Sequence, residues 1–161
     1  MAETGRPETG PETGRTGNGT DLFSGYIGGG VIKRWRIVMF QIKNYSDEQL
    51  AFVITCLFHE SIDTPEFKDW CVKISESKDA PSFIYDLMAF DGPLFKIHQS
   101  IGYVPYWEHT KDDEYALYGI AVLRGTHPYD MPISSSEALK SLKKSSEIMD
   151  LFSKVFDFIK L

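Results

Sequence analysis

Apolar residues recur every three to four positions from Ser46 onward, which is the spacing that places them on one side of an α-helix. The first such stripe consists of Leu50, Val53, Ile54, Leu57 and Phe58. It follows a Ser46-Asp-Glu-Gln49 tetrapeptide that has the form of a capping box, with hydrogen bonds from side chain to backbone in both directions. The pattern predicts a helix that starts here and ends near His59.

A second helix is predicted after a short turn. Thr64-Pro65-Glu66 supplies an N-cap, a proline at the first helical position and an acid that the helix dipole favours. The apolar stripe of this helix consists of Phe67, Trp70, Cys71 and Ile74.

The third and fourth predicted helices each follow a turn that contains a proline. The third begins at Asp79-Ala-Pro81 and the fourth after Asp91-Gly-Pro93. Their inward residues are Phe83, Ile84, Leu87 and Met88 in the third helix, and Leu94, Ile97, His98 and Ile101 in the fourth.

An aromatic connection after Gly102 leads to the last two predicted helices. The fifth begins after Thr110 and ends at Gly125, and Ser134-x-x-Glu137 caps one long final helix. Buried positions are Leu117, Ile120, Ala121 and Val122 in the fifth helix, and Leu139, Leu142, Met149, Phe152, Phe156 and Ile159 in the last.

The fold class that follows is mainly α, a compact array of five to six amphipathic helices. The β-branched stretch "VIKRWRIVMFQI" at 31–42 leaves room for one short N-terminal strand. With 161 residues, of which 42% are hydrophobic, the chain has enough apolar surface for one domain.

The chain changes character near Met39. Nine of the 13 glycines lie in residues 1–38, together with the near-repeat "ETGRPETGPETGRTG", and such sequence buries too little surface to order itself. We interpret 1–38 as a flexible leader or as sequence preceding the authentic start, and 39–161 as a single helical domain.

No apolar run reaches the roughly 18 residues that a membrane span needs. The N-terminus also lacks the apolar core of a signal peptide. We therefore expect a cytoplasmic protein that makes no contact with a membrane. Two cysteines, Cys56 and Cys71, are too few for a disulfide framework.

The net charge of the chain indicates which class of partner it can bind. The chain holds 17 Lys and Arg against 23 Asp and Glu, a net charge of −6. Residues 1–38 carry five basic and four acidic side chains, which leaves twelve basic and nineteen acidic from Met39 onward, a net charge of −7. An acidic domain attracts basic partners and repels nucleic acid.

The stretch "CLFHESIDTPEFKDW" holds the one catalytic-looking string, His59-Glu60 followed by Asp63. A zinc-protease motif needs two ligands at i and i+4 on one helical face. Here the helix ends before Asp63, so the expected geometry fails and no metal or cofactor is predicted. A thiol nucleophile at Cys56 has no surrounding motif to support it.

The most distinctive segment is "GYVPYWEHTKDDEYALY" at 102–118, which interleaves aromatics with acids. Aromatics supply contact area and acids steer a basic partner. The alternative is that the aromatics anchor a loop while the acids cap a helix. The candidate partner-binding residues of this segment are Tyr103, Tyr106, Trp107, Glu108, Asp112, Asp113 and Glu114.

A second acidic run surrounds the first turn between helices. Glu60, Asp63 and Glu66 in this run extend the candidate binding surface, and the alternative is an ordinary solvated helix face.

The run from "DEQLAFVITCLFHESIDTPEFKDWCVKI" to "PSFIYDLMAF" resembles small helical bacterial orphan proteins of toxin–immunity loci. The resemblance covers roughly residues 47–90 and is carried by Ile62, Glu66, Phe67, Trp70, Tyr85, Asp86 and Leu87. It implies a helical, non-catalytic protein, and some of the relatives neutralise toxins by tight binding.

The sequence thus favours a non-enzymatic acidic protein of immunity type, which neutralises a basic toxin or effector domain by direct binding. Two alternatives stay open. One is a metal-dependent or thiol hydrolase that uses the His59, Glu60 and Cys56 region, and the other is a self-associating scaffold or regulator.

Overall fold

The computed structural model describes residues 44–161, which form seven α-helices, one short 3-10 helix and no strand. This confirms the mainly α fold class. The elements are α2 (Asp47–Phe58), α3 (Thr64–Ser75), α4 (Phe83–Ala89), η1 (Leu94–Lys96), α5 (Ile97–Ile101), α6 (Lys111–Leu123), α7 (Ser135–Lys144) and α8 (Ser146–Val155). The leader at 1–38 and the strand predicted at 31–42 lie outside the described residues.

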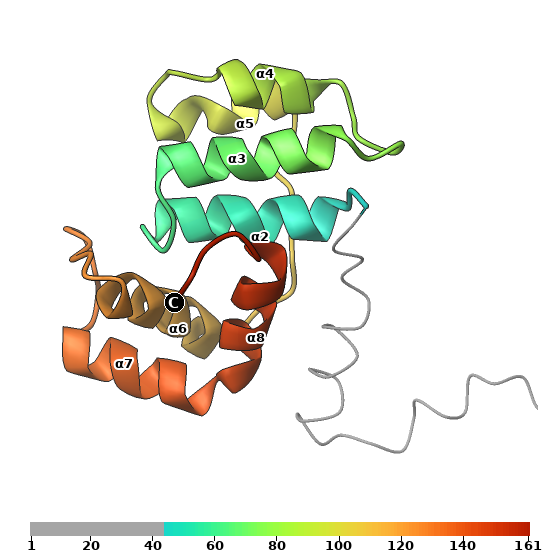
Figure 1. Cartoon of the computed structure of the whole chain (residues 1–161). Helices are drawn as coiled ribbons and strands as arrows, with labels where there is room; N and C mark the ends of the chain where they lie inside the picture. The colour runs from blue at the N-terminus through green and yellow to red at the C-terminus, as the bar shows by residue number, and fades with distance from the viewer. Residues whose placement is uncertain (1–43) are drawn as a thin grey trace, which may run out of the picture.

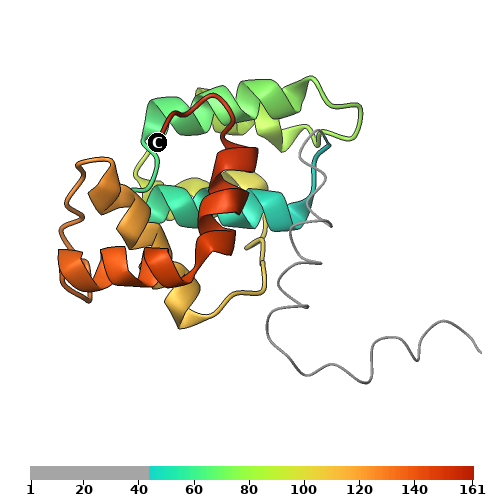
Figure 2. The same ribbon diagram turned by 60° about the horizontal axis from the view of Figure 1, so that its bottom comes forward.

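Helix α2 lies at the centre of the fold, between two groups of helices (Figure 1). On one side α3 runs alongside α2, with α4 and α5 beyond α3. On the other side α6 and α7 pack against each other, and α8 crosses α2 at a steep angle, as Figure 2 also shows. None of the helices in residues 44–161 combines the length and the apolar character that a membrane crossing requires.

The core joins the two groups through the buried ring of Phe52 on α2. The Trp107 ring meets it edge-on, with 5.1 Å between ring centroids, and the Phe156 ring lies 6.3 Å away. Trp107 belongs to the connection between α5 and α6, and Phe156 follows α8, so one side chain links three parts of the chain. The stripe predicted for α3 is confirmed, because Phe67, Trp70, Cys71 and Ile74 are all buried.

Two of the predicted helix starts and one predicted capping box needed correction. Ser46 does cap α2, because its hydroxyl oxygen accepts the backbone N–H of Gln49. The capping box is one-sided, however, since neither Oε1 nor Nε2 of the Gln49 side chain has a hydrogen-bond partner in the described part of the chain. The N-cap of α3 is Asp63 and not Thr64, because the Asp63 carboxylate accepts the Glu66 N–H at 2.8 Å. Helix α4 begins at Phe83, after a Ser82 whose side chain makes no cap.

Other boundaries follow the prediction. Thr110 with Asp113, and Ser134 with Glu137, form capping boxes at the starts of α6 and α7. Gly125 follows the end of α6 with φ of 83°, a conformation that favours glycine.

The prediction of one long final helix is wrong. The chain leaves helical geometry at the buried Ser145 (φ −105°, ψ 61°), which separates α7 from α8. Two adjacent serines have low helix propensity, and the change of direction lets Leu142 on α7 and Phe152 on α8 both reach the core. The fourth predicted helix spans the expected residues, but it begins with a 3-10 turn, which is followed by the five residues of α5.

Gly119 sets the distance between α6 and α7. A Cβ atom at this position would lie 2.5 Å from the backbone oxygen of Ala138 and 2.7 Å from Cβ of Leu142, both on α7. Only glycine therefore allows the two helices to pack this closely.

Candidate partner-binding surface

The connection between α5 and α6 is fixed to α2 by Trp107. Its indole is buried and donates a hydrogen bond from Nε1 to Oγ1 of Thr55 at 3.1 Å. The neighbouring Tyr106 side chain is 70% exposed, and Glu108 is exposed as well. The predicted segment therefore combines both interpretations, since Trp107 anchors a loop that presents Tyr106 and Glu108 to solvent.

Tyr103 is tied to the start of α2. Its hydroxyl donates to the Asp47 carboxylate at 2.6 Å, and the Tyr45 hydroxyl donates to the same carboxylate oxygen. Its ring meets that of Phe83 edge-on at 6.0 Å. Burial and the hydrogen bond to Asp47 raise the pKa of Tyr103. Although partly exposed, Tyr103 has a structural role at the edge of the segment.

The acidic residues of the segment likewise divide into those held by contacts within the protein and those exposed to solvent. Asp113 is buried and accepts hydrogen bonds from the N–H and the hydroxyl of Thr110, at 2.8 and 2.9 Å. Glu114 pairs with Nε2 of His109 at 3.0 Å. Asp112 is exposed to solvent on the first turn of α6.

The turn between α2 and α3 is locked to the end of α6 by Arg124. The guanidinium pairs with both carboxylate oxygens of Glu66 and donates to the backbone oxygen of Ser61. The Ser61 hydroxyl in turn donates to the backbone oxygen of Leu117 at 2.7 Å. Glu66 also accepts the N–H of Asp63 at 2.9 Å, so its charge is fully engaged within the protein.

Glu60 is held in the same turn in an unusual conformation. It has φ of 55°, in the left-handed region, and follows the C-cap His59. The Glu60 N–H donates to Leu57 O and the Ser61 N–H donates to Cys56 O, which is the Schellman pattern that normally has glycine at this position. The side chain of Glu60 is exposed.

Three carboxylates act on the charge of Tyr118 on α6. Burial raises the pKa of Tyr118, and the negative charges of Glu114, Asp130 and Glu60 raise it further. Glu60 lies in the turn after α2, Glu114 on α6, and Asp130 in the connection to α7. We call these three side chains the acidic face.

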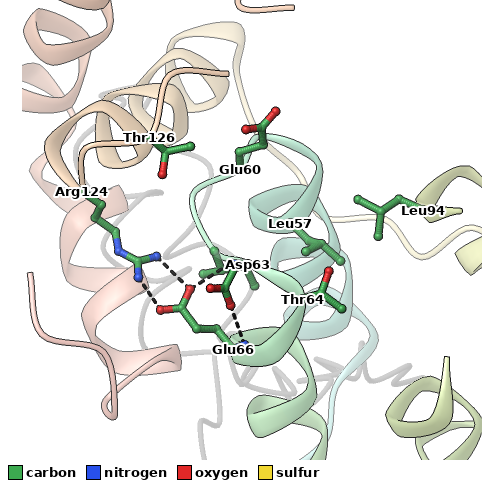
Figure 3. Close-up of a pocket in the computed structure, with 9 residues that line it drawn as sticks. Leu57, Glu60, Asp63, Thr64, Glu66, Leu94, Arg124 and Thr126 are labelled. Carbon is green, nitrogen blue, oxygen red and sulfur yellow. Dashed lines mark hydrogen bonds and ion pairs between the residues drawn. The ribbon is translucent and has the colours of Figure 1, made fainter. Parts of the chain in front are cut away.

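A hollow of about 430 Å³ lies beside Glu60, between the α2–α3 turn and the end of α6. Figure 3 shows the Arg124 guanidinium facing the Glu66 carboxylate, with Asp63 beside them. Apolar walls come from Leu57, Ile62 and Leu94. The hollow extends the acidic face toward α3.

The apparent catalytic string does not assemble. His59 closes α2 and Asp63 caps α3, so the two residues do not share a helical face. Within residues 44–161 no group of three His, Cys, Asp or Glu side chains is placed to hold a metal ion. The Cys56 thiol is fully buried, and burial raises its pKa well above the ordinary value.

Comparison of the chain with protein-family models, with curated proteins and with solved structures finds no match. The candidate surface therefore rests on geometry alone. Sequence reasoning missed Arg124, Tyr118 and Asp130, because their roles depend on contacts with residues far away in the chain. Only the position of Arg124 beside the helix-ending Gly125 gave a local signal.

Proposed function

We propose that this chain is a non-enzymatic binding protein of immunity type, which neutralises a basic toxin or effector domain by direct contact. The observation that carries the proposal is the acidic face, where the exposed Glu60 and Asp130, from separate segments, act with Glu114 on the charge of Tyr118. Glu114 is paired with His109, but Glu60 and Asp130 are exposed like charges, and a basic partner would relieve the repulsion between them.

Exposed aromatics beside these acids supply contact area. The Tyr129 side chain is 96% exposed and precedes Asp130 directly, while Tyr106 is exposed on the connection that leads to α6. Tyrosines contribute strongly to protein–protein interfaces, and acids around them favour fast association with a basic surface. The proposal includes a location in the cytoplasm of a bacterium, where an immunity-type protein would meet a toxin.

The backbone at Glu60 also supports a role in binding. A residue other than glycine in the left-handed region costs about 1 kcal/mol. A glutamate in this position therefore lowers the stability of the fold, but it places an exposed negative charge beside the hollow. Strain of this kind is common where a side chain serves binding rather than folding.

The proposal is tested with the proteins encoded beside this chain's own gene. Each is expressed in a bacterial host with and without this chain, and growth is recorded. The expected result is that one neighbour arrests growth, that this chain restores it, and that the purified pair binds in calorimetry. If no neighbour is toxic and none binds, the proposal fails.

Variants separate binding from folding. Glu60→Gly should raise the free energy of unfolding by about 1 kcal/mol because it removes the backbone strain. It should nevertheless weaken partner binding. Asp130→Lys should weaken binding roughly tenfold, which corresponds to about 1.4 kcal/mol.

The matched control is Asp86→Lys, an equal change of charge on an exposed position of α4, which lies on the far side of α3 from α6 (Figure 1). Equal losses of affinity in Asp130→Lys and Asp86→Lys would show that net charge matters and the acidic face does not.

A further inference from the structure

His109 occupies a position in which both of its ring nitrogens meet acceptors. Nδ1 lies 2.8 Å from the backbone oxygen of Trp107, and Nε2 lies 3.0 Å from the Glu114 carboxylate. A carbonyl and a carboxylate only accept hydrogen bonds, so both contacts form together only when the imidazole carries two protons and a positive charge.

The ring also stacks on the indole of Trp107. The ring centroids lie 4.4 Å apart with 17° between the planes, an arrangement in which a cationic ring is favoured over a neutral one. Trp107 is itself held by Thr55, so the imidazolium lies between a buried anchor and the first turn of α6.

We infer that His109 is a pH-sensitive clamp, which fixes the connection at 103–110 against α6 while its imidazole is charged and loosens it when the ring is neutral. In the neutral ring that keeps its Nδ1 proton, the Nε2 lone pair faces the Glu114 carboxylate, and the favourable contact becomes repulsive.

The charged and titratable groups near Glu114 indicate that His109, and not His59, is the histidine whose charge controls the loop. His59 at the end of α2 faces the same carboxylate of Glu114, but burial lowers the pKa of His59, and the charge of His109 lowers it further. On α6, Tyr118 also faces Glu114, the Lys111 amine lies over the Tyr115 ring, and Asp113 is engaged with Thr110.

Tyr106 and Glu108 alternate with the two clamped positions, Trp107 and His109. Release of the clamp loosens the loop that presents them, so the surface offered to a partner changes with pH. This device belongs to the fold of the free protein, and it holds whether or not the proposed partner is a toxin.

Nitrogen NMR of the His109 ring across pH 5.5–8.5 distinguishes the charged ring from each neutral tautomer. Glu114→Gln keeps the size of the side chain and removes its charge, so the midpoint of the His109 titration should move to lower pH. Asp112→Asn, the adjacent exposed acid, is the control and should leave the midpoint close to that of the unmodified protein. Equal midpoints in Glu114→Gln and in the unmodified protein would overturn the inference.

Amide hydrogen exchange tests the clamp itself. After correction for the intrinsic pH dependence, exchange of the amides in 103–110 should accelerate roughly threefold as His109 loses its charge, the ratio expected for one partly exposed ion pair. His109→Gln should remove this step while the helices stay protected. A step that persists in His109→Gln, or none in the unmodified protein, would show that His109 does not control the loop.

Discussion

At the end of α2 the imidazole of His59 packs against the Tyr118 ring, with 4.5 Å between centroids, and its Nδ1 lies 2.8 Å from the backbone oxygen of Thr55. The carbonyl accepts the Nδ1 proton, so acid must protonate Nε2. Burial opposes that charge and lowers the pKa of His59 below its ordinary value of 6.5. The unfolded chain thus takes up this proton at a higher pH than the folded protein.

The sign of the linkage predicts an acid effect on stability. The full contribution of His59 is present above pH 6.5 and is lost as the pH falls through the lowered pKa of the folded state. His59→Gln should therefore lose less stability than the unmodified protein between pH 7 and pH 5, measured by urea unfolding at each pH. The same comparison in a His109→Gln background isolates His59, and identical pH slopes there would contradict the assignment.

The two cysteines give a prediction about reactivity. Burial raises the pKa of both thiols, that of Cys71 to about 12. Because the thiolate is the reactive form, a disulfide reagent at pH 8 should modify neither cysteine while the protein is folded, and both after denaturation. Rapid modification of Cys56 in the folded protein would instead favour the thiol-hydrolase alternative.

At the level of elements, the sequence predicted those features that depend on neighbouring residues. The apolar stripe of α3, the start of α6 after Thr110 and the cap of α7 at Ser134 are local patterns, and they appear where expected. The break at Ser145 was missed because apolar spacing continues on both sides, and only packing against α2 and α6 decides that the chain must turn.

The binding surface was predictable to a smaller extent for the same reason. Exposed Tyr106 and Glu108 follow from a local pattern, whereas the engagement of Glu66 with Arg124 joins residues 58 positions apart. Glu60 and Asp63 look equivalent in the sequence, yet Asp63 caps a helix and Glu60 is exposed in a strained turn.

Gly119 gives a direct test of the α6–α7 contact. In Gly119→Ala the added methyl group meets the backbone of Ala138, which cannot move aside without shifting α7. Alanine has the better helix propensity by about 1 kcal/mol, but overpacking should outweigh it and lower the free energy of unfolding by about 1–3 kcal/mol. Ser153→Ala on the exposed face of α8 is the control and should not destabilise. A stabilised Gly119→Ala protein would show that the helices are farther apart.

The pairing of Arg124 with Glu66 is best measured as a coupling energy. Glu66 also caps α3, so a single substitution there mixes two losses. A double-mutant cycle with Arg124→Met and Glu66→Gln cancels the shared cap effect and should leave a coupling of about 1–2 kcal/mol, as expected for a bidentate pair that is largely shielded from water. Additive effects would mean that the α2–α3 turn is held mainly by Ser61 and Leu117.

For the whole molecule, the net charge of −7 from Met39 onward affects association and stability in opposite directions. The charge keeps the free protein soluble and speeds encounter with a basic partner, while like charges on the acidic face destabilise the unbound fold. Binding and folding should therefore respond differently to salt, because added ions screen both the steering and the repulsion.

Stopped-flow measurement of the association rate tests this balance once the partner is identified. The rate constant should fall steeply between 50 and 500 mM salt, by at least an order of magnitude, while the dissociation rate changes little. Glu60→Gln combined with Asp130→Asn should flatten the salt dependence, whereas Asp86→Asn on α4 should not. If the Asp86→Asn protein shows the same flattening, steering is a property of the whole acidic domain and the face around Tyr118 has no special part in recognition.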